Sequence, residues 1–254
     1  MSLRIAFDCD GVVADLDAAL AEIVTRLFGE APPVEVPPVD EPAAEKEATA
    51  PDADAPAAEA PPSDGPTEEE IQAAPARFRT LTRRQQHDLW EAVRNTGNFW
   101  ESLQETEPGI VARLATLARG RRWEVIFVTQ RPSSAGDTTQ IQTQRWLASH
   151  GFDRPSVYVI RSTRGKVADA LSLDVVVDDR PENCLDVKLE SRARAILVWN
   201  DDPASLPPNT RKLGIEPVTS LGECLDLLTD VPAAKPGVFK RIKQLIGASR
   251  IDPA

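Results

Sequence analysis

A short apolar run near the N-terminus ends abruptly in two carboxylates, and this feature constrains the fold most strongly. Residues 3–7 are followed directly by Asp8, Cys9, Asp10 and Gly11. Alternate side chains of an extended segment point the same way, so Asp8 and Asp10 are expected to share a site at the carboxyl end of a buried strand. Two carboxylates held that close disfavour joint ionisation unless a cation lies between them, and oxygen ligands on a tight turn suit Mg²⁺. The alternative is a strand-to-helix turn capped by aspartate, although a cap needs only one.

The second half of the chain alternates strand-like apolar segments with helical ones. After the first strand, strands are expected at 123–128, 157–160, 174–177 and 195–199, with the end of a last one at Val218. This alternation predicts the α/β class, with a Rossmann-like parallel sheet flanked by helices on both faces. Ligands bind such sheets beyond the carboxyl ends of the strands, which is where the polar signatures of this chain fall.

A helical cap is expected between the first and second strands, over residues 16–105. Within it, residues 31–76 hold eleven of the chain's 22 prolines and twelve acidic residues but one lysine. Such a stretch lacks the large apolar side chains needed to offset its chain entropy, and it is predicted to be a disordered insertion. Ordered helix is expected to resume at Thr67 and again at Thr82, because each begins a capping-box pattern.

These boundaries divide the chain into a core, a cap and a tail. The core is expected at residues 1–15 and 106–232, and residues 233–254 are expected to form a basic amphipathic tail, with lysine and arginine interleaved among apolar residues from 235 to 250. The role of the insertion, as a solvated loop or an acidic interaction arm, is left open.

Composition bounds the function classes. The net charge of −11 arises within the insertion, so the remainder is balanced and overall acidity says little about the ligand. No apolar run approaches the length of a membrane span, and the early charged residues are unlike a signal peptide. Three scattered cysteines are typical of a reducing compartment. A cytoplasmic protein without a transmembrane segment or a nucleic-acid polymer as partner is therefore expected, in an oligomeric state that the sequence leaves open.

The polar signatures together resemble a known family. Asp8-Cys9-Asp10-Gly11-Val12 is similar to the first motif, Asp-x-Asp-Gly-(Val/Thr), of the haloacid-dehalogenase-like (HAD) phosphohydrolases. Thr129 matches the family's strand-end threonine, Lys166 is the candidate for its lysine, and Asp178-Asp179 matches its acidic pair. All four parts occur in the family's order.

The resemblance implies a Mg²⁺-dependent phosphatase that acts on a small phosphorylated substrate. Asp8 is the implied nucleophile, which forms an aspartyl-phosphate, and Asp10 is the implied general acid and base. The implied phosphate-binding residues are Thr129, Gln130 and Lys166, and the implied metal site comprises Asp8, Asp10 (through its backbone carbonyl), Asp178 and Asp179.

Further motifs narrow the resemblance to bacterial proteins grouped with the deoxyribonucleotide-type 5′-nucleotidases. These motifs are residues 178–183, the Thr-x-Arg-Pro at 129–132 and Gln144–Leu147 before a glycine. They imply a (deoxy)nucleoside 5′-monophosphate as substrate. The alternatives are a sugar-phosphate or general metabolite phosphatase, and a non-catalytic scaffold that recruits partners through its acidic arm and basic tail. Phe99 and Trp100 either stack a nucleobase or hold the cap to the core.

Overall fold

The computed structural model describes residues 2–29 and 66–230. Six strands form one parallel sheet in the order β5-β4-β1-β6-β7-β8, which confirms the predicted α/β class. The strands are β1 (Arg4–Asp8), β4 (Glu124–Thr129), β5 (Ser156–Val159), β6 (Val175–Asp178), β7 (Arg194–Val198) and β8 (Glu216–Val218). The strand that ends in the first aspartate therefore lies in the middle of the sheet.

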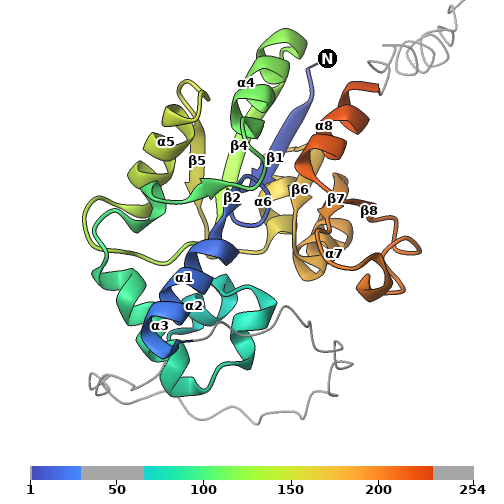
Figure 1. Cartoon of the computed structure of the whole chain (residues 1–254). Coiled ribbons are helices and arrows are strands. Elements are labelled where there is room, and N and C mark those ends of the chain that lie inside the picture. The colour runs from blue at the N-terminus through green and yellow to red at the C-terminus, as the bar shows by residue number, and fades with distance from the viewer. Residues whose placement is uncertain (1, 30–65, 231–254) are drawn as a thin grey trace, which may run out of the picture.

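Helices cover both faces of this sheet because successive strand residues point to opposite sides. Phe7 belongs to the cluster that packs α4 (Ile110–Arg121), α5 (Thr139–Ser149) and α8 (Leu221–Asp230) on one face. Ala6 belongs to the cluster that packs α6 (Arg164–Ala170) and α7 (Pro181–Glu190) on the other. Figure 1 shows this layered arrangement.

A helical unit lies between β1 and β4 in the sequence. It comprises α1 (Leu16–Phe28), α2 (Glu68–Ala73), the 3-10 turn η1 (Ala76–Thr80), α3 (Arg83–Asn95) and the 3-10 turn η2 (Phe99–Glu101). A two-stranded antiparallel pair joins its ends, β2 (Ala14–Asp15) with β3 (Gln104–Glu105). In Figure 1 the unit lies beyond the end of the sheet toward which β1 runs, so it faces the edge where ligands of parallel sheets bind.

The end of the predicted disordered insertion is ordered, which corrects the boundary at residue 76. Thr67 and Glu70 form the expected capping box at the start of α2. Ala73 and Ala74 are buried, and Arg94 of α3 forms an ion pair with the buried Glu70. Small alanines and a charge pair thus hold a segment whose large apolar side chain, Ile71, is 45% exposed.

The remaining expectations about the insertion, over residues 31–65, and about the tail at 233–254 lie outside the described residues. None of the helices in the described part of the chain combines the length and the apolar character needed to cross a membrane.

Candidate active site

The first strand delivers two aspartates into a tight turn. Asp8 ends β1 and is 7% exposed, and the backbone then folds back so that the N–H groups of Val13 and Ala14 both donate to Cys9 O, at 2.9 and 2.8 Å. Gly11 has φ +75°, and a Cβ there would overlap the carboxylate of Asp179. A glycine is required at this position for both reasons.

Three carboxylates meet at the ends of the two neighbouring strands β1 and β6. Oxygens of Asp8, Asp178 and Asp179 lie within 4.8 Å of one another. Asp178 is fully buried and accepts hydrogen bonds from Asn183 Nδ2 at 2.9 Å and Arg180 N at 3.0 Å. Oδ1 of Asp179 is buried and has no hydrogen-bond partner among the described residues.

Arg164, at the start of α6, is a basic side chain that reaches these carboxylates. It is 4% exposed, pairs with Asp8 through Nη2, and donates from Nε to Asp178 Oδ2 at 3.0 Å. Its Nη1 is buried and has no acceptor among the described residues. Lys166, which the sequence suggested for this role, is exposed and does not line the cavity around Asp8.

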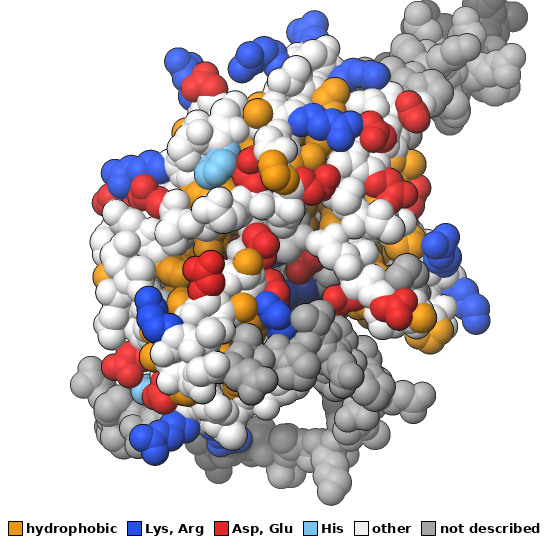
Figure 2. All heavy atoms as spheres, viewed as in Figure 1, with side chains coloured by type: hydrophobic (Ala, Val, Ile, Leu, Met, Phe, Trp, Pro, Cys, Tyr) orange, Lys and Arg blue, Asp and Glu red, His pale blue; other side chains and the backbone are white. Residues whose placement is uncertain are grey.

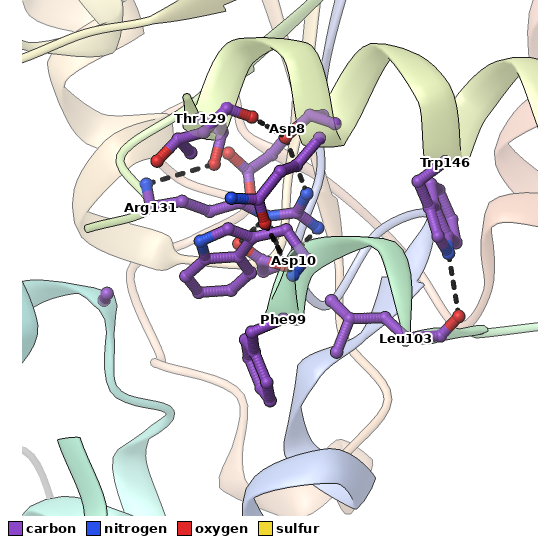
Figure 3. A network of polar contacts seen from close by, with 12 residues as sticks. Asp8, Asp10, Phe99, Leu103, Thr129, Arg131 and Trp146 are labelled. Carbon is purple, nitrogen blue, oxygen red and sulfur yellow. Dashed lines mark hydrogen bonds and ion pairs between the residues drawn. The ribbon is translucent and has the colours of Figure 1, made fainter. Parts of the chain in front are cut away.

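Asp10 has a separate partner, Arg131, which follows β4. The guanidinium of Arg131 donates from Nε to both carboxylate oxygens at 3.0 Å and from Nη2 to Oδ1 at 2.7 Å. Nη1 of Arg131 donates to Thr143 Oγ1 at 2.9 Å, so the guanidinium is fixed. The Asp10 carboxylate therefore lies outside the cluster of three, and Figure 3 shows its contact with Arg131.

The two aromatic side chains of η2 are buried. Trp100 is fully buried, donates from Nε1 to Pro132 O at 3.0 Å, and its ring lies 4.8 Å from the Arg131 guanidinium carbon. Phe99 is 4% exposed and points away from Asp8 and Thr129 in Figure 3. Neither ring lines the cavity. Buried rings offer no face to a ligand, so this placement agrees with the alternative in which they hold the helical unit to the core.

Thr129 and Gln130 both lie at the cavity, as expected from the sequence. Thr129 is fully buried, and its Oγ1 accepts a hydrogen bond from Arg131 N at 3.3 Å. Its strand β4 pairs with β1 so that Val128 lies beside Asp8, which brings the two strand ends together. The side chain of Gln130 donates to Ser162 O at 3.5 Å.

The electrostatics of this edge favour a cation. Burial raises the pKa of the Asp179 carboxyl to about 7, the charge of Asp178 adds to the rise and Arg180 opposes it. Burial also raises the pKa of Asp8 well above its usual range, although the Arg164 guanidinium acts against this shift. The side chains at this edge include four carboxylates and two buried guanidinium groups, those of Arg131 and Arg164, so carboxylates outnumber these guanidinium groups.

The residues present therefore fit a divalent metal ion. Its candidate ligands are Asp8, Asp178 and Asp179, with the unpartnered Oδ1 of Asp179 as an open position. Oxygen ligands of this kind are the ones that Mg²⁺ prefers.

A cavity of about 700 Å³ opens over the site. Its floor includes Asp8, Asp10, Thr129 and Arg164, and the helical unit contributes part of its wall through residues 73 and 75–77 and Arg79. In Figure 2 acidic side chains gather around a hollow near the centre of the molecule. The volume is within the range typical of small-molecule sites.

Sequence reasoning missed the roles of Arg164 and Arg131. Arg131 stands in the Thr-x-Arg-Pro pattern, and an arginine two residues after a strand end was a usable signal. Arg164 lies two residues before Lys166 in the sequence, and its burial could not be read from one sequence.

No protein-family model matches the chain, and no curated protein matches it. Two solved structures are similar over 91% of this chain and the whole of theirs: a protein from Thermotoga maritima assigned as a beta-phosphoglucomutase (17% identity, TM-score 0.48) and a hydrolase from Pseudomonas syringae (12% identity, TM-score 0.47).

Proposed function

We propose that this protein is a Mg²⁺-dependent phosphatase that hydrolyses small phosphate monoesters. The observation that carries the proposal is a pair of unpartnered buried atoms beside Asp8: Oδ1 of Asp179, a position for a cation, and Nη1 of Arg164, a donor for a phosphoryl oxygen. A buried polar group without a partner is costly, so each atom is expected to find one when substrate and metal are bound.

In the first step, a carboxylate oxygen of Asp8 attacks the phosphorus atom. A P–O bond to Asp8 forms while the bond to the leaving oxygen breaks, and Asp10 gives its proton to that oxygen. Arg164 and the backbone and hydroxyl groups at Thr129 hold the remaining phosphoryl oxygens, where their charge and dipoles act in a buried site. The products of this step are the alcohol and an aspartyl-phosphate.

In the second step, water attacks the phosphorus atom and gives a proton to Asp10. The P–O bond to Asp8 breaks, which releases inorganic phosphate and restores the carboxylate. Oδ1 of Asp10 accepts two hydrogen bonds from Arg131 and Oδ2 accepts one. Oδ2 is therefore the oxygen expected to carry the proton, while Arg131 keeps the side chain in place.

Asp8, Asp178 and Asp179 would hold the metal ion. When bound, Mg²⁺ neutralises charge so that an anionic nucleophile and an anionic substrate can approach each other.

We further propose a nucleoside 5′-monophosphate as the substrate, a HAD-like core at 1–15 and 106–232, and a cap at 16–105 that covers the site. Support comes from the order of the motifs and from the cavity, which is large enough for more than a phosphate group. Arg79 of the cap lines this cavity. Burial and the nearby Arg180 lower the pKa of Arg79, as expected for a cation that would gain from an anionic ligand.

The test is phosphate release from nucleoside 5′-monophosphates, sugar phosphates and acetyl phosphate, each with and without millimolar Mg²⁺. We expect Mg²⁺-dependent release, and loss of it in Asp8→Asn because an amide is a poor nucleophile. A second readout needs no turnover: Mg²⁺ should raise the melting temperature, because a ligand that binds only the folded state stabilises it, by about 2.7 kcal/mol at 100 times its Kd.

The matched control is Asp179→Asn, in which Mg²⁺ should raise the melting temperature less than in the wild type, because one of the three carboxylate ligands is lost. No release from any of these compounds, together with no Mg²⁺ effect on melting, would contradict the phosphatase and favour the scaffold alternative.

A further inference from the structure

The cavity extends from the aspartates to a second wall that the proposed chemistry does not use. This wall, here called the β7 lobe, consists of Trp199, Asn200, Pro207, Asn209, Leu213 and Ile215. We propose that the β7 lobe binds a flat ring in the organic part of the substrate. The inference rests on the proposed function, because it assumes that the phosphate group lies at Asp8.

The topology of the sheet places the β7 lobe beside the site. β7 pairs with β6, and Leu197 lies opposite Asp178 in the register. Trp199 follows two residues after Leu197, at the same carboxyl edge of the sheet as the acidic pair. A group attached to a phosphate at Asp8 can therefore reach the lobe within one continuous cavity.

The lobe is a fixed wall. Thr210 is 3% exposed, and its hydroxyl donates to Pro207 O at 2.7 Å. The N–H of Ile215 donates to Thr210 O at 3.1 Å, which closes the loop that carries Leu213. Trp199 donates from Nε1 to Asp202 O at 3.2 Å, so the polar edge of the indole is already satisfied within this loop.

The chemistry of the lobe suits a ring with apolar faces and a polar edge. Trp199 is the one aromatic side chain among the described residues that line the cavity, and it is half-buried. Leu213 lines the same cavity and is 46% exposed, a large apolar side chain that a bound ring would cover. Asn200 and Asn209 are exposed and make no side-chain hydrogen bonds to the described residues. Their amides can donate to or accept from ring heteroatoms.

The experiment measures binding and turnover separately. The binding probe is 1-naphthylmethylphosphonate, a ring-bearing analogue that is not hydrolysed. Its dissociation constant is measured by calorimetry in the presence of Mg²⁺. Turnover is measured with 1-naphthyl phosphate and with acetyl phosphate, which is too short to reach the lobe. The variants are Trp199→Ala and Leu213→Asp.

Two control variants match these changes away from the cavity. Trp123→Ala removes a half-buried tryptophan that precedes β4, and Leu189→Asp places the same charge on a leucine of α7 that is 74% exposed. Neither residue lines the cavity. Because Leu213 and Leu189 are exposed, this pair remains informative even if Trp199→Ala is poorly folded.

If the β7 lobe binds the ring, Trp199→Ala and Leu213→Asp should each weaken binding of the naphthyl probe by about tenfold or more, as expected for the loss of one stacking contact. The same variants should leave acetyl phosphate turnover within about twofold of wild type, and both controls should bind the probe normally. No binding of the probe to the wild type, or equal binding by Leu213→Asp and Leu189→Asp, overturns the lobe. If the wild type binds the probe and Trp199→Ala does not, but the wild type hydrolyses neither substrate, the phosphatase is overturned and the lobe still stands.

Discussion

Arg164 and Lys166 lie two residues apart on α6 but have different surroundings. Residues two apart on a helix do not share a face, and Gly165 between them packs so closely on α7 that a Cβ would overlap the backbone oxygen of Asp186. This packing fixes the rotation of α6, with Arg164 buried against Asp8 and Lys166 exposed. A single glycine contact thus decides which basic residue enters the site.

The pair provides a direct mutational comparison. Arg164→Ala should lower kcat/KM for any hydrolysed ester by about 100-fold or more, the loss typical of one stabilising donor, while Lys166→Ala should stay within about twofold. Arg164→Lys should recover activity in part, since it keeps the charge but not the fork of donors. Steady-state kinetics on variants of normal melting temperature measures this, and an equal loss in the Lys166→Ala variant would return that lysine to the site.

Gly11 offers a second comparison, with Gly29 as its match. Both have positive φ, +75° and +85°, so alanine at either position should cost about 1–2 kcal/mol of stability. At Gly29 nothing lies within 4 Å of an added Cβ, whereas at Gly11 the Cβ would displace the carboxylate of Asp179. Denaturant unfolding should show the backbone cost alone in Gly29→Ala and a larger loss in Gly11→Ala, where the Cβ also meets Asp179, and phosphate release should be lost in Gly11→Ala alone. Normal turnover by folded Gly11→Ala would mean that Asp179 is dispensable.

For single residues, the sequence predicted the position of a site residue where local chemistry requires a particular residue type. Asp8, Asp10, Thr129 and the acidic pair could be located because they follow apolar runs that end at one edge of a sheet. The partnership between Arg131 and Asp10 could not, because it joins residues 121 apart through a guanidinium fixed by tertiary contacts. The positions of Phe99 and Trp100 also depended on packing that a sequence pattern does not contain.

Among the elements, α2 connects the helical unit to the sheet. Arg180, directly after the acidic pair, donates from Nη2 to Ala73 O at 3.0 Å and Ala74 O at 3.2 Å, at the end of α2. The other anchor of α2 is the ion pair between buried Glu70 and Arg94 of α3. Since Ala73 lines the cavity, these contacts also shape the site.

Breaking the second anchor should loosen α2. Arg94→Met leaves Glu70 buried without its partner, and we expect a loss of about 1–3 kcal/mol, less than for a fully buried pair because the Arg94 side chain is 33% exposed. The double variant Glu70→Gln/Arg94→Met should recover part of the loss, because it buries no unpaired charge. Arg84→Met, on an exposed position of α3, is the control. Denaturant unfolding that gave identical curves for Arg94→Met and Arg84→Met would show that the pair contributes nothing.

Element boundaries were predictable where capping chemistry marks them. The capping boxes at Thr67 and Thr82 both occur as expected. Helix α7 was not anticipated, because its start at Pro181 continues the acidic signature and its apolar positions are few. The short pair β2–β3 was also missed, since two-residue strands leave no periodic pattern.

For the molecule as a whole, topology accounts for the location of the site and tertiary packing for its shape. The alternation of strands and helices predicted that the carboxyl ends of the strands share one edge of a parallel sheet, whereas the strand order makes β4, β1 and β6 neighbours there. The β7 lobe did not follow, because the loop after β7 has no periodicity, and its place beside Asp178 depends on strand order.

The central claim, that Asp8 carries the transferred phosphoryl group, is tested most directly by trapping the protein during turnover. The protein is mixed with a hydrolysed ester in Mg²⁺, quenched in acid and digested, and the peptides are analysed by mass spectrometry. We expect one added phosphoryl group on the peptide that contains Asp8, lost on treatment with hydroxylamine and absent from the Asp8→Asn variant. Phosphate release at the full rate with no phosphorylated peptide, or with the group on another residue, would contradict the account.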